Sequence, residues 1–266
     1  LIGGVNTGRR ITSGKCNVAV GSAALKSTTT GCFNVALGQC AMSDAIVTGN
    51  RNIALGYHAA NSITSGQDNV FMGTYAGCLE VDATNNVYIG NEAGACATSG
   101  EGNTFLGYLA GKGNSSSGVT GEYNVAVGAG ALCVLSSGSR NIALGNDAGS
   151  NLTTGAESVS IGYNAGKAVT TTSGNVFIGC SAGCCSTGTS NTVIGNGAGL
   201  SLSTGNYNTF IGLNAARYSG CENTLTGSCN IVIGTILGGG RLTAGCDNIL
   251  MGCLLYTSPS PRDNTG

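Results

Sequence analysis

A five-residue motif recurs along almost the whole chain: Asn, an apolar residue, any residue, an apolar residue, then Gly. It occurs fourteen times, mostly 17 residues apart, from NVAVG at Asn17 to NILMG at Asn248. One copy, at Ser158, begins with Ser. Fourteen phased copies cannot arise by chance, and a short fixed period is the signature of proteins whose repeats stack on one another.

Each repeat predicts one short strand. The apolar residues alternate with a period of two, which suits a strand and not a helix. Ala usually stands three residues after the motif Gly, where a small side chain fits a narrow interior, and a second Gly usually precedes the Asn by three residues and allows a tight turn. We therefore predict an all-β fold, a parallel β-solenoid or β-roll of about fourteen rungs with mostly 17-residue repeats.

The repeats define the domain boundaries. Residues 1–252 are expected to form one solenoid domain that is truncated at both ends, since Leu1-Ile2-Gly3 matches the last three residues of a motif. Two longer intervals place loop insertions around Asn114–Ser117 and Tyr218–Glu222. Residues 253–266 hold both prolines in the string CLLYTSPSPRD, which resembles a translated sequencing adapter. We interpret them as a non-native tail.

The first motif position predicts a ladder of stacked amides. Identical Asn side chains on successive rungs can hydrogen-bond to one another and to turn backbone, so a structural role is favoured over ligand binding. Ser158 is expected to weaken the ladder locally. The predicted ladder consists of Asn17, Asn34, Asn52, Asn69, Asn86, Asn103, Asn124, Asn141, Asn175, Asn191, Asn208, Asn230 and Asn248.

The apolar second and fourth positions are predicted to face the interior, as at Val18, Leu37, Leu55, Met72, Ile89, Leu106, Ile178 and Ile194. The third position should then face outward, yet none of its residues is charged. Its aromatic members are Phe71, Tyr88, Phe105, Phe177 and Phe210. Because a strand that is apolar on both faces is normally covered on both, we expect this stripe to be an interface between parallel chains. Alternatively, its aromatics pack against the small Ala positions within one chain.

Composition and residue placement give no support for catalysis. Charged residues make up 9% of the chain, the net charge is −1, and His58 is the only histidine. His58 is expected to be a solvated surface residue, and no pair of carboxylates recurs at one position in adjacent rungs. The thirteen cysteines form no CxxC pair and are interpreted as replacements for Ser or Ala. We predict no enzyme activity, no cofactor, no metal, no nucleic-acid partner and no membrane insertion.

The pattern N-h-x-h-G-x-x-A, in which h is an apolar residue, resembles the YadA-like head repeats of trimeric autotransporter adhesins. It is also similar to the tail-fibre repeats of phages that precede endosialidase-type intramolecular chaperone domains. The resemblance covers residues 1–252. It implies a left-handed β-roll, a parallel homotrimer, an extracellular location on a cell surface or virion, and an unknown surface receptor or glycan as partner.

The sequence therefore favours a structural and adhesive fibre module for surface or host attachment, with the loops as its binding surface. One alternative is an ice-binding solenoid, which needs a flat ordered array of threonines. The threonine runs, such as Thr28-Thr29-Thr30, fall instead in loops of varying length. A second alternative is a glycan-cleaving tailspike, which the absence of paired carboxylates disfavours.

Overall fold

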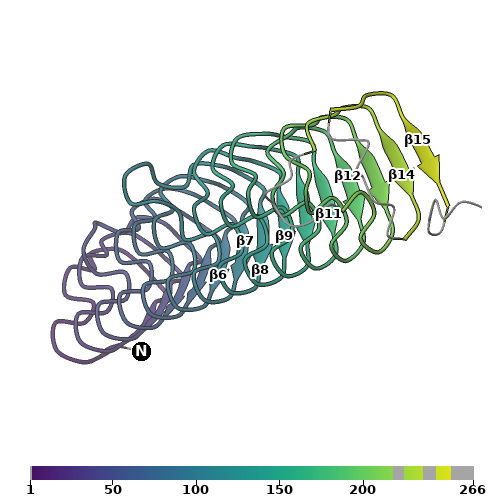
Figure 1. Ribbon diagram of the computed structural model, residues 1–266. Coiled ribbons are helices and arrows are strands. Elements are labelled where there is room, and N and C mark those ends of the chain that lie inside the picture. Colours follow the sequence, from purple (N-terminus) through teal and green to yellow (C-terminus); the bar gives the residue numbers. More distant parts are fainter. Residues whose placement is uncertain (1, 218–224, 236–243, 253–266) are drawn as a thin grey trace, which may run out of the picture.

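The chain winds into a β-solenoid, in which every turn contributes one short strand to a single parallel sheet (Figure 1). The computed structural model describes residues 2–217, 225–235 and 244–252, and no helix occurs in these ranges. The fifteen strands pair in sequence order, so the predicted all-β solenoid fold is confirmed. They are β1 (Ile2–Gly3), β2 (Val18–Val20), β3 (Val35–Leu37), β4 (Ile53–Leu55), β5 (Val70–Met72), β6 (Val87–Ile89), β7 (Thr104–Leu106), β8 (Val125–Val127), β9 (Ile142–Leu144), β10 (Val159–Ile161), β11 (Val176–Ile178), β12 (Thr192–Ile194), β13 (Thr209–Ile211), β14 (Ile231–Ile233) and β15 (Ile249–Met251).

The strands stack in register, so equivalent motif positions form straight columns. In β6 and β7, for example, Tyr88 pairs with Phe105. At the start of the chain, however, Ile2 pairs with Ala19 and Gly3 with Val20. The equivalent of the motif glycine is therefore Gly4, and the sequence alignment of Leu1-Ile2-Gly3 with the motif end was wrong by one residue.

The side-chain phase of the strands, meaning which motif positions point into the coil, is the reverse of the sequence prediction. The middle residue of strands β2 to β14 is buried, whereas the residues on either side of it are partly or fully exposed in every strand from β2 to β15. The second- and fourth-position residues predicted to be core, Val18, Leu37, Leu55, Met72, Ile89, Leu106, Ile178 and Ile194, therefore face outward. The predicted interface stripe, Phe71, Tyr88, Phe105, Phe177 and Phe210, lies in the core at 0–1% exposure.

The physical reason is the alternation itself. The motif Asn is buried, because its amide bonds to the neighbouring rungs from inside the coil. With a period of two, the third position must point to the same side as the Asn, and the second and fourth positions must point away. The alternative interpretation, in which the aromatics pack within their own chain, is confirmed.

Small and large side chains are paired at two core positions of the rungs. The Ala three residues after the motif Gly is fully buried, as at Ala93 and Ala110. One residue further on, the rungs of Phe71, Tyr88, Phe105 and Phe177 have Gly: a Cβ on Gly94 would lie 2.5 Å from Cδ2 of Tyr88. Three rungs with Ala in the strand instead have a large residue at this position, in the pairs Ala19 and Leu25, Ala36 and Met42, and Ala126 and Leu132. In these rungs a small residue at one of the two positions is therefore matched by a large residue at the other.

The glycine that ends each strand is required by the close stacking of the rungs. Gly107 has a φ of +134°, and a Cβ there would lie 2.7 Å from the carbonyl oxygen of Gly128 on the next rung. Only glycine fits this corner without moving the neighbouring backbone.

The first predicted insertion forms an exposed turn at residues 114–117, flanked by a parallel bridge between Ala97 and Val119. The second, at Tyr218–Glu222, and the predicted tail at residues 253–266 lie outside the described residues.

Candidate functional site

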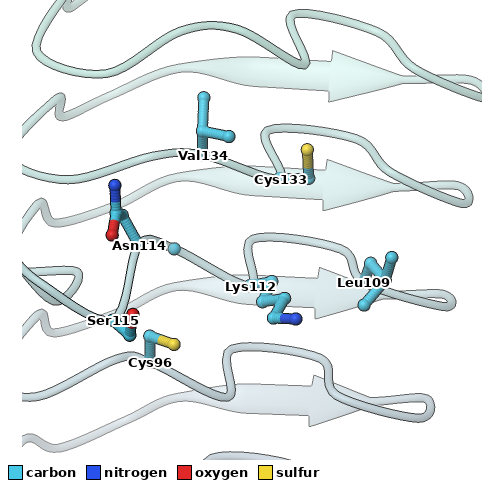
Figure 2. A pocket seen from close by; sticks show the side chains of 8 residues that line it. Cys96, Leu109, Lys112, Asn114, Ser115, Cys133 and Val134 are labelled. Atoms are coloured by element: carbon cyan, nitrogen blue, oxygen red, sulfur yellow. The ribbon is translucent and has the colours of Figure 1, made fainter.

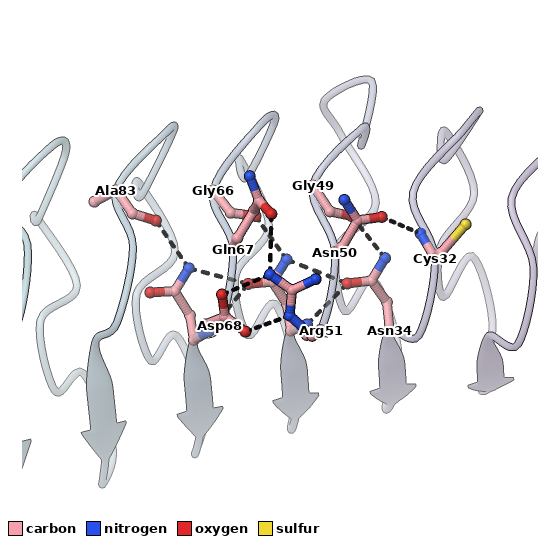
Figure 3. A network of polar contacts seen from close by, with 11 residues as sticks. Cys32, Asn34, Gly49, Asn50, Arg51, Gly66, Gln67, Asp68 and Ala83 are labelled. Carbon is pink, nitrogen blue, oxygen red and sulfur yellow. Dashed lines mark hydrogen bonds and ion pairs between the residues drawn. The ribbon is translucent and has the colours of Figure 1, made fainter.

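The asparagine column forms a continuous hydrogen-bond ladder along the inside of one corner (Figure 3). The Oδ1 of Asn34 accepts a hydrogen bond from the backbone N–H of Asn52 at 2.9 Å, while its Nδ2 donates to the carbonyl of Gly49 at 2.9 Å. The same two bonds recur from Asn17 to Asn230, and Asn248 closes the series. Each buried amide thus pairs two backbone groups of the following rung, and the ladder is a structural element.

The ladder is weakest at Ser158. Its hydroxyl accepts the N–H of Asn175 at 3.3 Å, which is longer than the 2.8–3.2 Å of the equivalent asparagine bonds. The hydroxyl also donates to the carbonyl of Ala156 within its own rung, at 3.3 Å. The shorter side chain therefore replaces the inter-rung amide bond with a local one.

The second and fourth motif positions of β2 to β15 form what we call the outer sheet face. None of its residues is charged, and every second-position residue is Val, Ile or Thr. Leu106 at 43% exposure and Ile142 at 39% are typical of its more exposed members. At about 4.8 Å per rung the face is roughly 65 Å long. A face of this length has a larger area than the apolar patches that soluble monomers usually expose.

An open pocket of about 450 Å³ lies where the first insertion leaves the coil (Figure 2). Its wall contains two thiols, Cys96 and Cys133, with Lys112 between them. The ammonium of Lys112 pairs with Glu92 at 2.7 Å. Burial raises the pKa of both thiols, so they stay protonated and are weak nucleophiles. Because the one cation of the pocket is already neutralised by Glu92, its lining supplies no activated group.

The cysteines form no metal centre in the described part of the chain, where no cluster of three or more His, Cys, Asp or Glu could hold an ion. Cys78 and Cys96, which lie on neighbouring rungs, are free thiols. Cys185 is disulfide-bonded. Most of the described cysteines thus occupy the solenoid wall as single residues.

A buried carboxyl was missed by sequence reasoning. Glu80 is fully buried in a core column whose neighbouring members are Ile63 and Ala97. Its Oε2 accepts a hydrogen bond from the hydroxyl of Tyr88 at 3.3 Å, and its Oε1 has no hydrogen-bond partner. Desolvation raises the pKa of Glu80 to about 8, so at neutral pH the carboxyl is mostly protonated.

The single histidine belongs to a cluster of rings on the surface, which we call the aromatic platform: Tyr57 and His58 after β4, and Tyr75 after β5. The His58 and Tyr75 rings are stacked at 5.4 Å with an interplanar angle of 22°. Tyr57 meets both edge-on, at 4.3 and 5.4 Å. His58 is therefore half-buried against tyrosines, in place of the solvated residue that the sequence predicted. Only the adjacency of Tyr57 and His58 was visible in the sequence.

Comparisons with known proteins name no relative: no family model, no curated protein and no solved structure matches this chain. Across the described residues, no helix is long and apolar enough to cross a membrane. The features of this chain that bear on function are therefore its own surfaces, the outer sheet face and the aromatic platform.

Proposed function

We propose that this chain is a structural, adhesive fibre module for surface or host attachment, assembled as a parallel homotrimer through the outer sheet face. One observation carries the proposal: a continuous, charge-free apolar face runs the length of a rod-shaped molecule. Burying it between parallel chains would remove apolar surface from water along the whole rod. The number three and the extracellular location are taken from the resemblance to adhesin and tail-fibre repeats.

The geometry of the face suits such an interface. A flat strip roughly 65 Å long and about 10 Å wide covers some 650 Å², close to the roughly 800 Å² per partner of a standard protein interface. Its flanks carry polar and aromatic groups: the corner before the strands bears Tyr123 and the Arg51–Asp68 pair. An apolar centre with a polar rim is the usual anatomy of an interface, and aromatic residues are enriched in interfaces.

Light scattering on the 266-residue chain tests the assembly. We expect a particle of three times the 26.1 kDa chain mass. The double variant Leu106→Lys/Ile142→Lys should dissociate into folded monomers, because it places two charges on the apolar face. Ser115→Lys, which adds a charge in the exposed insertion loop, is the matched control and should stay trimeric. A monodisperse wild-type monomer would refute the interface.

Ice binding remains a competing explanation for a flat solenoid face. Against it, only Thr104, Thr192 and Thr209 bring hydroxyls to the outer sheet face, at irregular intervals. A thermal-hysteresis measurement separates the two functions: ice-crystal shaping by the wild type that the Leu106→Lys/Ile142→Lys variant loses would replace the adhesive proposal.

A further inference from the structure

Among the exposed tyrosines of the solenoid, the aromatic platform is distinguished by its packing. Tyr57 and Tyr75 are 40% and 39% exposed, so their rings present open surface while contacting each other and His58. They come from two consecutive rungs of a stacked coil, which fixes their spacing. A ligand that lies across them would find the rings already in place and would lose little side-chain entropy on binding.

Hydrogen-bonded polar groups lie near the platform, Asn61 on the rung of Tyr57 and His58, and Ser43 and Asp44 on the rung before it. Asn61 Nδ2 donates to Asp44 Oδ2 at 2.8 Å, and Ser43 Oγ lies 2.8 Å from both Asp44 Oδ1 and Asn61 Oδ1. The hydrogen bonds of Ser43 and Asn61 lower the pKa of Asp44, and His58 and Lys26 add to this effect. The Asp44 carboxylate is therefore ionised near neutral pH; it is exposed, and it lies near enough to His58 for the two side chains to interact electrostatically.

We propose that Tyr57, His58 and Tyr75 form a saccharide-binding platform, with Asp44 and Asn61 as partners for the sugar hydroxyls. A sugar ring has one face of C–H groups, whose partial positive charge suits the negative face of an aromatic ring. Its rim of hydroxyls needs carboxylate and amide partners, which are strong acceptors and donors. This inference builds on the proposed adhesive function by naming the chemistry of the surface that the fibre would recognise.

The observations favour a saccharide over the other ligands of aromatic surfaces. A quaternary ammonium ion binds within a cage of ring faces, but here the three rings are packed against one another. An extended peptide needs a groove or a sheet edge, whereas the platform lies on a corner of the coil beyond the strand ends.

The test is binding of the 266-residue chain to an array of galactose, glucose, mannose and N-acetylglucosamine oligosaccharides, followed by calorimetric titration of the best binder. We expect wild-type binding, and a loss of about tenfold in affinity for Tyr57→Ala/Tyr75→Ala, equivalent to about 1.4 kcal/mol, because this variant removes both tyrosine rings of the platform. Asp44→Asn should also weaken binding. Tyr163→Ala is the matched control: Tyr163 occupies the position equivalent to Tyr57 after β10, is 53% exposed, and has no ring partner among the described residues.

Absence of binding to every saccharide on the array would overturn the proposal. So would binding that the double variant leaves unchanged, or that Tyr163→Ala reduces equally. Light scattering on the same samples keeps the two proposals apart: a monomer that binds sugar through the platform refutes only the trimer, and a trimer without sugar binding refutes only the platform.

Discussion

At the scale of single residues, the stability of this solenoid depends on how its buried polar groups are paired. Asn103 is fully buried, yet its Oδ1 accepts the N–H of Asn124 at 2.8 Å and its Nδ2 donates to the carbonyl of Gly121 at 2.8 Å. Both of those backbone groups face the interior. Without the Asn103 amide, these two buried backbone groups would have no hydrogen-bond partner, which costs free energy of folding.

Asn103→Ala should lower the free energy of unfolding by about 2–4 kcal/mol, because it leaves a buried donor and a buried acceptor unpaired. Asn146→Ala is the control, since Asn146 makes one exposed bond, to the carbonyl of Ala129, and should change stability by less than about 0.5 kcal/mol. Chemical denaturation measures both. Equal effects of the two variants would show that the ladder has no special role.

Glu80 predicts a pH dependence. Its pKa is raised from 4.5 to about 8 in the folded state, chiefly by desolvation, with Asp82 adding to the rise. Between these values the folded state binds more protons than the unfolded state, so this group makes stability fall as pH increases from about 4.5 to about 8. Glu80→Gln should remove that decline and raise the free energy of unfolding at pH 9 by on the order of a few kcal/mol. Parallel pH profiles of the two proteins would contradict a buried, titrating carboxyl.

At the scale of the rung, the side chains of the third motif residue and of the residue four positions after the motif Gly fill the same part of the core. Phe105 faces Gly111, whereas on the next rung Ala126 is matched by Leu132. Leu132 adopts a φ of +50°, close to the +53° of Gly111, so a leucine is tolerated at this backbone position. The two arrangements are alternative fillings of the same cross-section.

This complementarity predicts a rescue. Gly111→Leu alone should destabilise the protein by overpacking against Phe105, and Phe105→Ala alone should cost about 3–5 kcal/mol by leaving a cavity. The double variant recreates the Ala126–Leu132 arrangement and should be more stable than either single variant. Thermal melting of all four proteins gives the coupling, and additive effects would refute the shared volume.

Much of the rung could be predicted from the sequence. The period fixed the strand positions, and the small-residue column was recognised from Ala24 onward. The side-chain phase was predicted wrongly. The second and fourth motif positions hold the more consistently large residues and were therefore placed inside, whereas the third position holds Ala in half of the early rungs. The informative signals were the Asn, which shares its side of the strand with the third position, and the Gly that accompanies four of the five core aromatics, as Gly94 does Tyr88.

At the scale of the whole molecule, each rung contacts mainly its neighbours, so the rod has a uniform cross-section and two distinct surfaces. The outer sheet face is continuous, whereas the aromatic platform is confined to the segments that follow β4 and β5. The platform could not be predicted, since Tyr57 and Tyr75 occupy different positions of their repeats and meet only through the stacking of two rungs. The left-handed coil implied by the resemblance stays a prediction.

The side-chain phase is the claim on which both the core and the proposed interface depend, and two adjacent lysine substitutions test it directly. The measurement is thermal melting followed by circular dichroism. Phe105→Lys places a charge in the core and should unfold the neighbouring rungs, with a loss of several kcal/mol. Leu106→Lys places the same charge on the outer sheet face and should leave a folded chain. A stable Phe105→Lys protein together with an unfolded Leu106→Lys protein would contradict the structure's phase.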